Sequence, residues 1–195
     1  FISDGSALFL IEGYNYMSSG VATTLHFMYP VVTAVVMMTF YHEARRLSTV
    51  LAIVMAVAGV GILSWDPTGQ TSLRGVVIVL ISAVCYALYL IRVNRSRAAH
   101  MESLKLVFYI MFIGALIFLA EALRQNTFQP IANALQLGNL AALALICTIV
   151  TNVCLVVSVK RIGSTMTAVI GALEPLTAVV IGGLVFDEAF TWQVL

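Results

Sequence analysis

Several ionisable and amide side chains lie inside stretches of sequence that are otherwise apolar. Glu12 is flanked by Tyr14 and Asn15, and Glu174 directly precedes Pro175. A charge in apolar surroundings is costly unless it is paired or neutralised, so each carboxyl group has two interpretations. It can bind a cationic group or a proton. Alternatively, Glu12 is a neutral acid hydrogen-bonded to a Tyr or Asn, and Glu174 braces a helix break.

Other polar residues share this ambiguity. His26 lies one turn before Pro30 and can relay protons or serve as an interhelical hydrogen-bonding group. Tyr86 and Tyr89 are three residues apart on one helix face, where they can stack on a ligand or simply pack. Asn15 and Asn152 are candidates for a polar cavity and equally for hydrogen bonds between helices.

Two prolines and two carboxylates mark helix breaks and helix ends. Pro30 and Pro175 fall in the middle of apolar segments, where a proline removes a backbone donor and kinks a helix. Glu43 and Glu188 follow at the ends of the same segments. We expect a structural or gating role for these four residues rather than contact with a ligand.

Composition places the chain in a lipid bilayer. Hydrophobic residues make up 61% of 195 positions and charged residues 10%, and the mean hydropathy is +1.02. A soluble domain is about one quarter charged, so this chain cannot cover a core with a hydrated surface. The net charge of +1 gives no support to nucleic-acid binding. The three scattered cysteines form no metal-ligand pattern, and no sequence motif indicates a cofactor.

A spanning helix needs about 20 apolar residues, and the sequence predicts an all-α, polytopic bundle of transmembrane helices. Short connections leave no room for a soluble domain. Eight of the ten Lys and Arg residues fall on one side of the predicted spans, which should be the cytoplasmic side. The chain does not begin with Met, and we expect it to be an internal piece of a longer protein. The predicted spans are 1–17 (the weakest), 21–41, 48–65, 74–93, 104–123, 138–159 and 165–186.

A repeat relates the second and last predicted spans at an offset of 145 residues. Pro30 matches Pro175 and Glu43 matches Glu188, so the same Pro-to-Glu spacing recurs in both copies. The offset covers five spans, an odd number, so the second copy must be inverted in the membrane. Inverted repeats built around broken helices are a recurring design of secondary transporters.

These residues resemble a known family. Ser19-Gly20-Val21-Ala22 with Pro30 and Glu43, and Gly163-Ser164 with Glu174-Pro175 and Glu188, are similar to the two EamA repeats of the drug/metabolite transporter superfamily. The resemblance covers essentially the whole chain. It implies ten spans from two inverted five-helix repeats, truncated here at both ends. Residues 1–65 would then hold spans 3–5, and residues 74–195 would hold spans 6–9.

The leading functional hypothesis is a secondary transporter of a small molecule, without enzymatic activity. The resemblance implies export of amino acids, related metabolites or drug-like compounds by alternating access, and a multi-pass location in a bacterial inner membrane. A proton as coupling ion, a homodimer and the direction of transport stay open. The alternatives are a membrane-embedded receptor or structural protein and an intramembrane enzyme.

Overall fold

The computed structural model describes residues 2–43, 50, 51, 53–55, 58, 72–125, 131, 133–171, 173, 174 and 177. These residues contain helices and no strand, which confirms the all-α prediction. The elements are α1 (Ile2–Gly13), α2 (Ser19–His26), α3 (Tyr29–Phe40), α5 (Leu73–Arg95), the 3-10 helix η1 (Arg97–His100), α6 (Ser103–Arg124), α7 (Ala134–Ala142), the π-helix η2 (Leu143–Val150), α8 (Thr151–Ile162) and α9 (Ser164–Gly171).

Four described segments are long and apolar enough to cross a membrane. They are Gly20–Phe40, Leu73–Arg95, Ser103–Arg124 and Ala134–Ile162. They correspond to the predicted spans 21–41, 74–93, 104–123 and 138–159, so the chain is a polytopic α-helical membrane protein. Most of the predicted spans 48–65 and 165–186 lies outside the described residues.

The weakest predicted span, 1–17, differs from the structure. Its helix, α1, has 12 described residues and ends at Gly13. Tyr14, Asn15 and Tyr16 then form tight turns, with backbone amides that donate to carbonyls only three or four residues earlier. The polar residues at the end of this segment therefore lie in a turn beyond α1 rather than within a continuous span.

The segment predicted as the span 21–41 is interrupted in its middle. Phe27 and Met28 form a turn between α2 and α3, and Pro30 is the second residue of α3. A proline is tolerated in the first turn of a helix because its missing N–H would have no partner there. Pro30 thus begins a new helical segment beside the interruption. At the far end of α3, His42 has a φ of 53°, and the Glu43 amide returns to the Met37 carbonyl.

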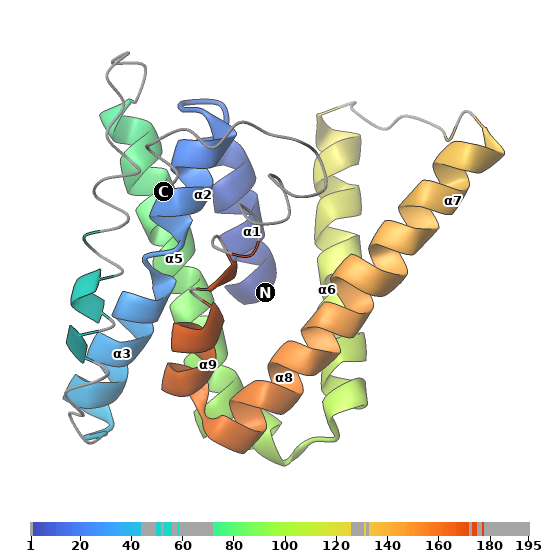
Figure 1. Cartoon of the computed structure of the whole chain (residues 1–195). Coiled ribbons are helices and arrows are strands. Elements are labelled where there is room, and N and C mark those ends of the chain that lie inside the picture. Colours follow the sequence, from blue (N-terminus) through green and yellow to red (C-terminus); the bar gives the residue numbers. More distant parts are fainter. Residues whose placement is uncertain are drawn as a thin grey trace.

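The packing of α1 on α5 is the most extensive helix pair among the described elements. Small residues permit it: Gly13 lies directly against Val79, and Gly75 lies against Tyr16 and Met17. Close approach through small residues is the usual way in which membrane helices associate. Figure 1 shows α1, α2, α3 and α9 gathered around α5.

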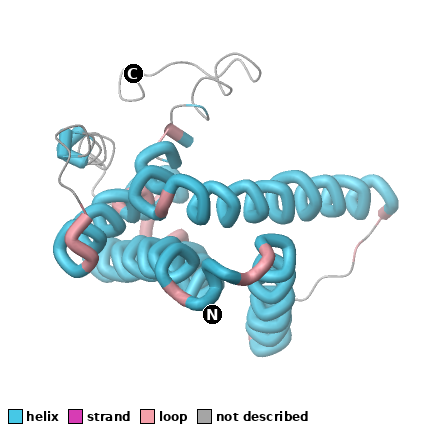
Figure 2. Tube along the Cα trace, turned by 90° about the horizontal axis from the view of Figure 1, so that it is seen from below, coloured by secondary structure: helices cyan, strands magenta, loops and turns pink. Residues whose placement is uncertain are grey.

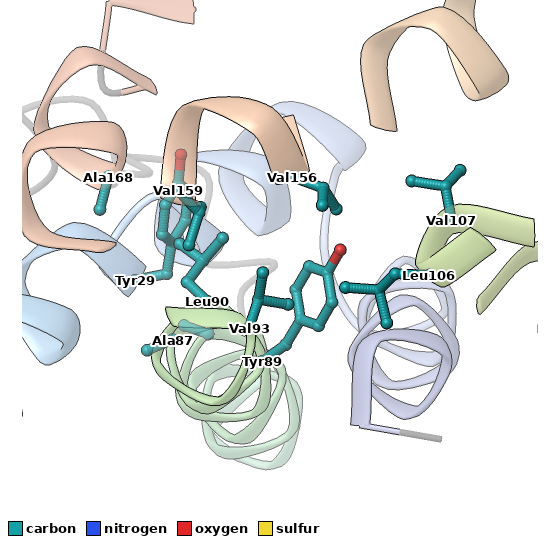
Figure 3. Close-up of a cluster of buried hydrophobic side chains, with 11 residues drawn as sticks. Tyr29, Ala87, Tyr89, Leu90, Val93, Leu106, Val107, Val156, Val159 and Ala168 are labelled. Atoms are coloured by element: carbon teal, nitrogen blue, oxygen red, sulfur yellow. The ribbon is translucent and has the colours of Figure 1, made fainter. Parts of the chain in front are cut away.

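The helix Ala134–Ile162 diverges from this group. Its α8 end packs on α5, α6 and α9, whereas its α7 end leans far away, as both Figure 1 and Figure 2 show. Only 6% of its most apolar window is buried. The main hydrophobic cluster therefore lies where α3, α5, α6, α8 and α9 meet, around Leu90, Val93 and Val159 (Figure 3).

Basic residues collect at one end of the helices. Arg92 and Arg95 lie in the last turn of α5, and Lys160 and Arg161 in the last turn of α8. The Lys160 ammonium donates to the Met101 carbonyl, in the turn between η1 and α6. We call this the inner end, because the excess of positive charge supports the prediction that it is cytoplasmic.

The contact of Gly13 with Val79 can be tested with a matched pair of variants. A Cβ at Gly13 would collide with the fully buried Val79 side chain, whereas a Cβ at Gly5, in the same helix, meets nothing. We expect Gly13→Ala to lower the free energy of unfolding by about 1–3 kcal/mol through overpacking. Gly5→Ala should leave it unchanged or raise it slightly. Thermal unfolding of the full-length protein in detergent would show this. Equal melting temperatures of Gly13→Ala and Gly5→Ala would contradict the contact between Gly13 and Val79.

Candidate functional site

A layer of polar side chains joins three helices near the middle of the membrane. Ser6 of α1 and Ser82 of α5 face each other, and both are buried. His26, the last residue of α2, extends this layer to the helix interruption. Ser82 lies near the middle of α5 and His26 near the middle of the span Gly20–Phe40, so the layer is at mid-depth. We call these three residues the polar layer.

The protons of the polar layer can be assigned from the distances. The Ser6 hydroxyl donates to the Ser82 carbonyl at 2.9 Å, and the Ser82 hydroxyl donates to the Ser6 carbonyl at 2.6 Å. Each hydroxyl has a single proton, so Ser82 Oγ can only accept from His26 Nδ1, 3.0 Å away. A neutral His26 therefore carries its proton on Nδ1 and its lone pair on Nε2.

Aromatic rings continue from the polar layer toward the inner end. The Tyr86 ring is 5.4 Å from the His26 ring and 4.7 Å from the Tyr29 ring, both in edge-to-face arrangements. Tyr89 follows at 5.8 Å from Tyr86. We call His26, Tyr29, Tyr86 and Tyr89 the aromatic cluster. The structure thus brings the predicted residues His26, Tyr86 and Tyr89 together and adds Tyr29.

The Tyr89 hydroxyl is buried without a hydrogen-bond partner among the described residues. Figure 3 shows it pointing toward Val156 of α8 and Leu106 of α6. A buried hydroxyl without a partner costs about 1–3 kcal/mol, so this group is available to a bound molecule or water. Tyr89 therefore gives the aromatic cluster a polar atom between α5, α6 and α8.

Helix α9 closes the aromatic cluster from a part of the chain that is far from α3 in the sequence. A Cβ at Gly171 would collide with the Tyr29 hydroxyl, so the helix backbone reaches this ring directly. Glu174 is exposed and lies within electrostatic range of Tyr29 and Tyr86. Tyr29 and Glu174 occupy equivalent positions at the offset of 145 residues, and the inverted repeat itself stays a prediction.

A second contact joins α9 to α3 at the inner end. The Thr165 hydroxyl, at the start of α9, donates to Glu43 Oε2 at 2.6 Å. Thr165 is buried and Glu43 is half-buried. The start of α9 therefore meets the end of α3, whereas the end of α9 meets the start of α3. The two helices run antiparallel.

Glu12, Tyr14 and Asn15 lie apart from this cluster, at the opposite end of the helices. Glu12 is exposed in the last turn of α1 and accepts from Asn15 Nδ2 at 3.2 Å, and Tyr14 contacts the Thr23 hydroxyl at 3.3 Å. Glu12 lines a groove of about 380 Å³ between α1 and α6, together with Glu121. The interpretation of Glu12 as deeply embedded differs from the structure, because α1 ends one residue later.

Asn152 is also separate from the aromatic cluster. Its side-chain amide donates to the Thr148 carbonyl at 2.8 Å, within its own helix. The preceding stretch, η2, has the wide turns of a π-helix, and the Thr148 and Thr151 hydroxyls bond to carbonyls five residues earlier. Asn15 and Asn152, both candidates for a polar cavity, are not brought together. Pro175 and Glu188 lie outside the described residues.

Sequence reasoning missed four residues of this region. Asp4, Ser6, Tyr29 and Ser82 are all buried. In the sequence, Asp4 is only one of the charged residues that make 1–17 the weakest predicted span. Serines in apolar runs are too common to single out, although their recurrence on two helices is typical of interhelical hydrogen bonding. In the described part of the chain, no group of three or more His, Cys, Asp or Glu residues could hold a metal ion.

The paired serine bonds predict that each hydroxyl stabilises the packing of α1 on α5. Each hydroxyl donates to a backbone carbonyl of the other helix, so the two bonds can be removed one at a time. We expect Ser6→Ala and Ser82→Ala each to lower the free energy of unfolding by about 0.6–1.7 kcal/mol, as for other interhelical hydrogen bonds in membranes. Unfolding of the full-length protein in detergent would measure this. Unchanged stability of both variants would contradict the bonding.

The sequence of the chain is similar to known transporters. The EamA-like transporter family matches residues 73–195, from the start of α5 onward. An uncharacterized transporter of Synechocystis sp. is 26% identical over 185 residues, which cover 91% of this chain and 54% of that protein. The chain spans about half the length of this relative. Because the family match covers more than half of the chain and the four candidate spans fit a multi-pass membrane protein, the chain belongs to the EamA-like transporter family.

Proposed function

We propose that the protein is a secondary transporter, which moves a small molecule across the membrane by alternating access. The observation that carries the proposal is the aromatic cluster. It lies beside an interrupted helix and combines residues of both predicted repeats, as expected for a binding site between two rocking halves. The name of the Synechocystis relative supports transport as the activity.

The chemistry of the aromatic cluster favours a small metabolite, such as an amino acid, or a drug-like compound. Ring faces and edges offer contact area, while the Tyr89 hydroxyl, His26 Nε2 and the Glu174 carboxylate offer a few polar groups. A carboxylate beside tyrosine rings also suits a protonated amine, because aromatic faces attract cations. We propose export as the direction and a bacterial inner membrane as the location, which the cyanobacterial relative supports.

Alternating access requires that the inner end can close. The contact between Thr165 and Glu43 joins α9 to α3 there, so the described state is held together at the inner end. When this contact breaks, α3 and α9 can separate and open a path from the aromatic cluster to the cytoplasm. The groove between α1 and α6, at the other end, is a candidate for the outer entrance. A homodimer stays a prediction.

The role of the aromatic cluster can be tested by transport. Full-length protein in liposomes, assayed with a panel of labelled amino acids and cationic drugs, should show saturable flux. We expect Tyr86→Ala to reduce kcat/KM about tenfold, the equivalent of about 1.5 kcal/mol of aromatic contact. Tyr109→Ala, which removes a tyrosine that is 45% exposed on α6, is the matched control. Equal losses in the two variants, or no flux of any compound by the wild type, would count against the proposal.

The inner contact predicts a shift between conformations. Thr165→Val removes the hydroxyl that donates to Glu43 and keeps the shape of the side chain. A hydrogen bond to a charged group is worth about 1.5–3 kcal/mol, so the inner end should open at least about tenfold more often. Ser164 is fully buried, so a cysteine at this position reacts only when the inner end opens. The opening can be measured as the rate at which a thiol reagent on the cytoplasmic side labels Ser164→Cys, in protein without other cysteines.

Thr24→Val is the control for this measurement, because the Thr24 hydroxyl bonds only to the Gly20 carbonyl of its own helix in the described structure. This variant should label Ser164→Cys at the unchanged rate. Unchanged labelling in Thr165→Val would show that the contact with Glu43 does not hold the inner end closed.

A further inference from the structure

The structure contains a buried carboxylate that is not part of the aromatic cluster. Asp4 of α1 is only 5% exposed. Its carboxylate lies against Gly114, at the middle of the α6 span, so close that a Cβ at Gly114 would collide with Oδ1. Asp4 therefore lies near the bilayer midplane. An acidic residue at that depth is costly and usually serves an ion or proton pathway.

The surroundings hold this carboxylate in a defined place. Two residues further along α1, Ser6 is bonded reciprocally to Ser82 of α5, which fixes both the rotation and the height of α1. Gly114 provides the space that the carboxylate occupies on α6. The position is thus built by three helices.

Titratable groups face Asp4 from two of the packed helices. Tyr89 of α5 lies within electrostatic range of it, and its hydroxyl has no described partner. His26 of α2 reaches α1 through Ser82 and Ser6. On α6, the titratable side chains Lys105, Tyr109, Glu121 and Arg124 are all more exposed than Asp4. On α1 itself, the next acid is Glu12, two turns away in the outer groove.

We propose that Asp4 is the carboxylate that takes up and releases the coupling proton during transport. This inference rests on the proposed transport function. An Asp4 oxygen accepts a proton when the site is open to the outside and releases it when the site is open to the inside, so one proton enters for each substrate molecule that leaves.

Polar groups lie on either side of Asp4 along the membrane normal. The polar layer lies toward the outer end, because Ser6 follows Asp4 in a helix that runs outward. Tyr89 lies toward the inner end of α5 and points between α6 and α8. Hydroxyl and imidazole groups can pass a proton between neighbours. Asp4 thus lies between an outer path through Ser6, Ser82 and His26 and an inner path past Tyr89.

The test uses full-length protein in liposomes with an imposed pH gradient and the best compound from the transport panel. A gradient of one pH unit is a tenfold difference in proton concentration. Exchange of one proton for one substrate molecule should therefore accumulate the substrate up to about tenfold. Asp4→Asn should keep exchange of labelled for unlabelled substrate but lose the response to pH. Glu102→Gln, which removes an exposed carboxylate at the start of α6, should keep both. Persistence of the response in Asp4→Asn, or accumulation driven by sodium instead of protons, would overturn the proposal.

A second measurement does not depend on transport. Infrared difference spectra between acidic and alkaline pH should contain the band of a protonated carboxyl that is missing in Asp4→Asn and present in Glu102→Gln. Absence of that band would overturn the role of Asp4 even if the protein transports. Its presence would support proton binding by Asp4 even if every compound in the panel fails. If Asp4→Asn does not fold, Asp4→Ser, which is smaller and equally unable to titrate, replaces it in both measurements.

Discussion

The reciprocal hydrogen bonds between Ser6 and Ser82 are the interaction on which the rest of the arrangement depends. In lipid, helices gain nothing from removing apolar surface from water, so small residues and polar contacts decide how they meet. The serines set the register of α1 against α5, and Gly13 and Gly75 permit the close approach. Once this pair is fixed, Asp4 faces Gly114 and His26 finds an acceptor in Ser82.

The interruption between α2 and α3 has a complementary role. It places His26 at the end of one helix and Tyr29 at the start of the next, so that both rings meet Tyr86 from one short turn. Helix α9 approaches the same point and contacts Tyr29 through Gly171. Segments far apart in the sequence therefore meet at this interruption. In the proposed transport mechanism, movement of α9 against α3 changes the access to this point.

Hydrophobic patterning carried most of the prediction of the fold. Length and apolarity located four spans to within a few residues, and Pro30 indicated where the second would be interrupted. The chemistry was harder to predict, because depth in the membrane depends on where a helix ends. Glu12 lies in an apolar stretch, but α1 ends at Gly13, whereas Asp4, which no sequence pattern singled out, is buried. Pairings such as Ser6 with Ser82, and Glu43 with Thr165, depend on helix rotation, which a single sequence does not specify.

The wide turns of η2 have a consequence for chain length. A turn with bonds between residues five apart holds one residue more than an α-turn, so Leu143–Val150 stores extra chain without breaking the long helix. Loss of one residue there would be absorbed as the stretch returned to α-geometry, so α7 and α8 would keep nearly the same relative facing. The same loss within α8, before Val156, would instead turn the residues beyond it by about 100° and move Val156 and Val159 away from α5. The stretch Leu143–Val150 is therefore the part of the long helix that can lose one residue without changing which surface of α8 the rest of the bundle receives.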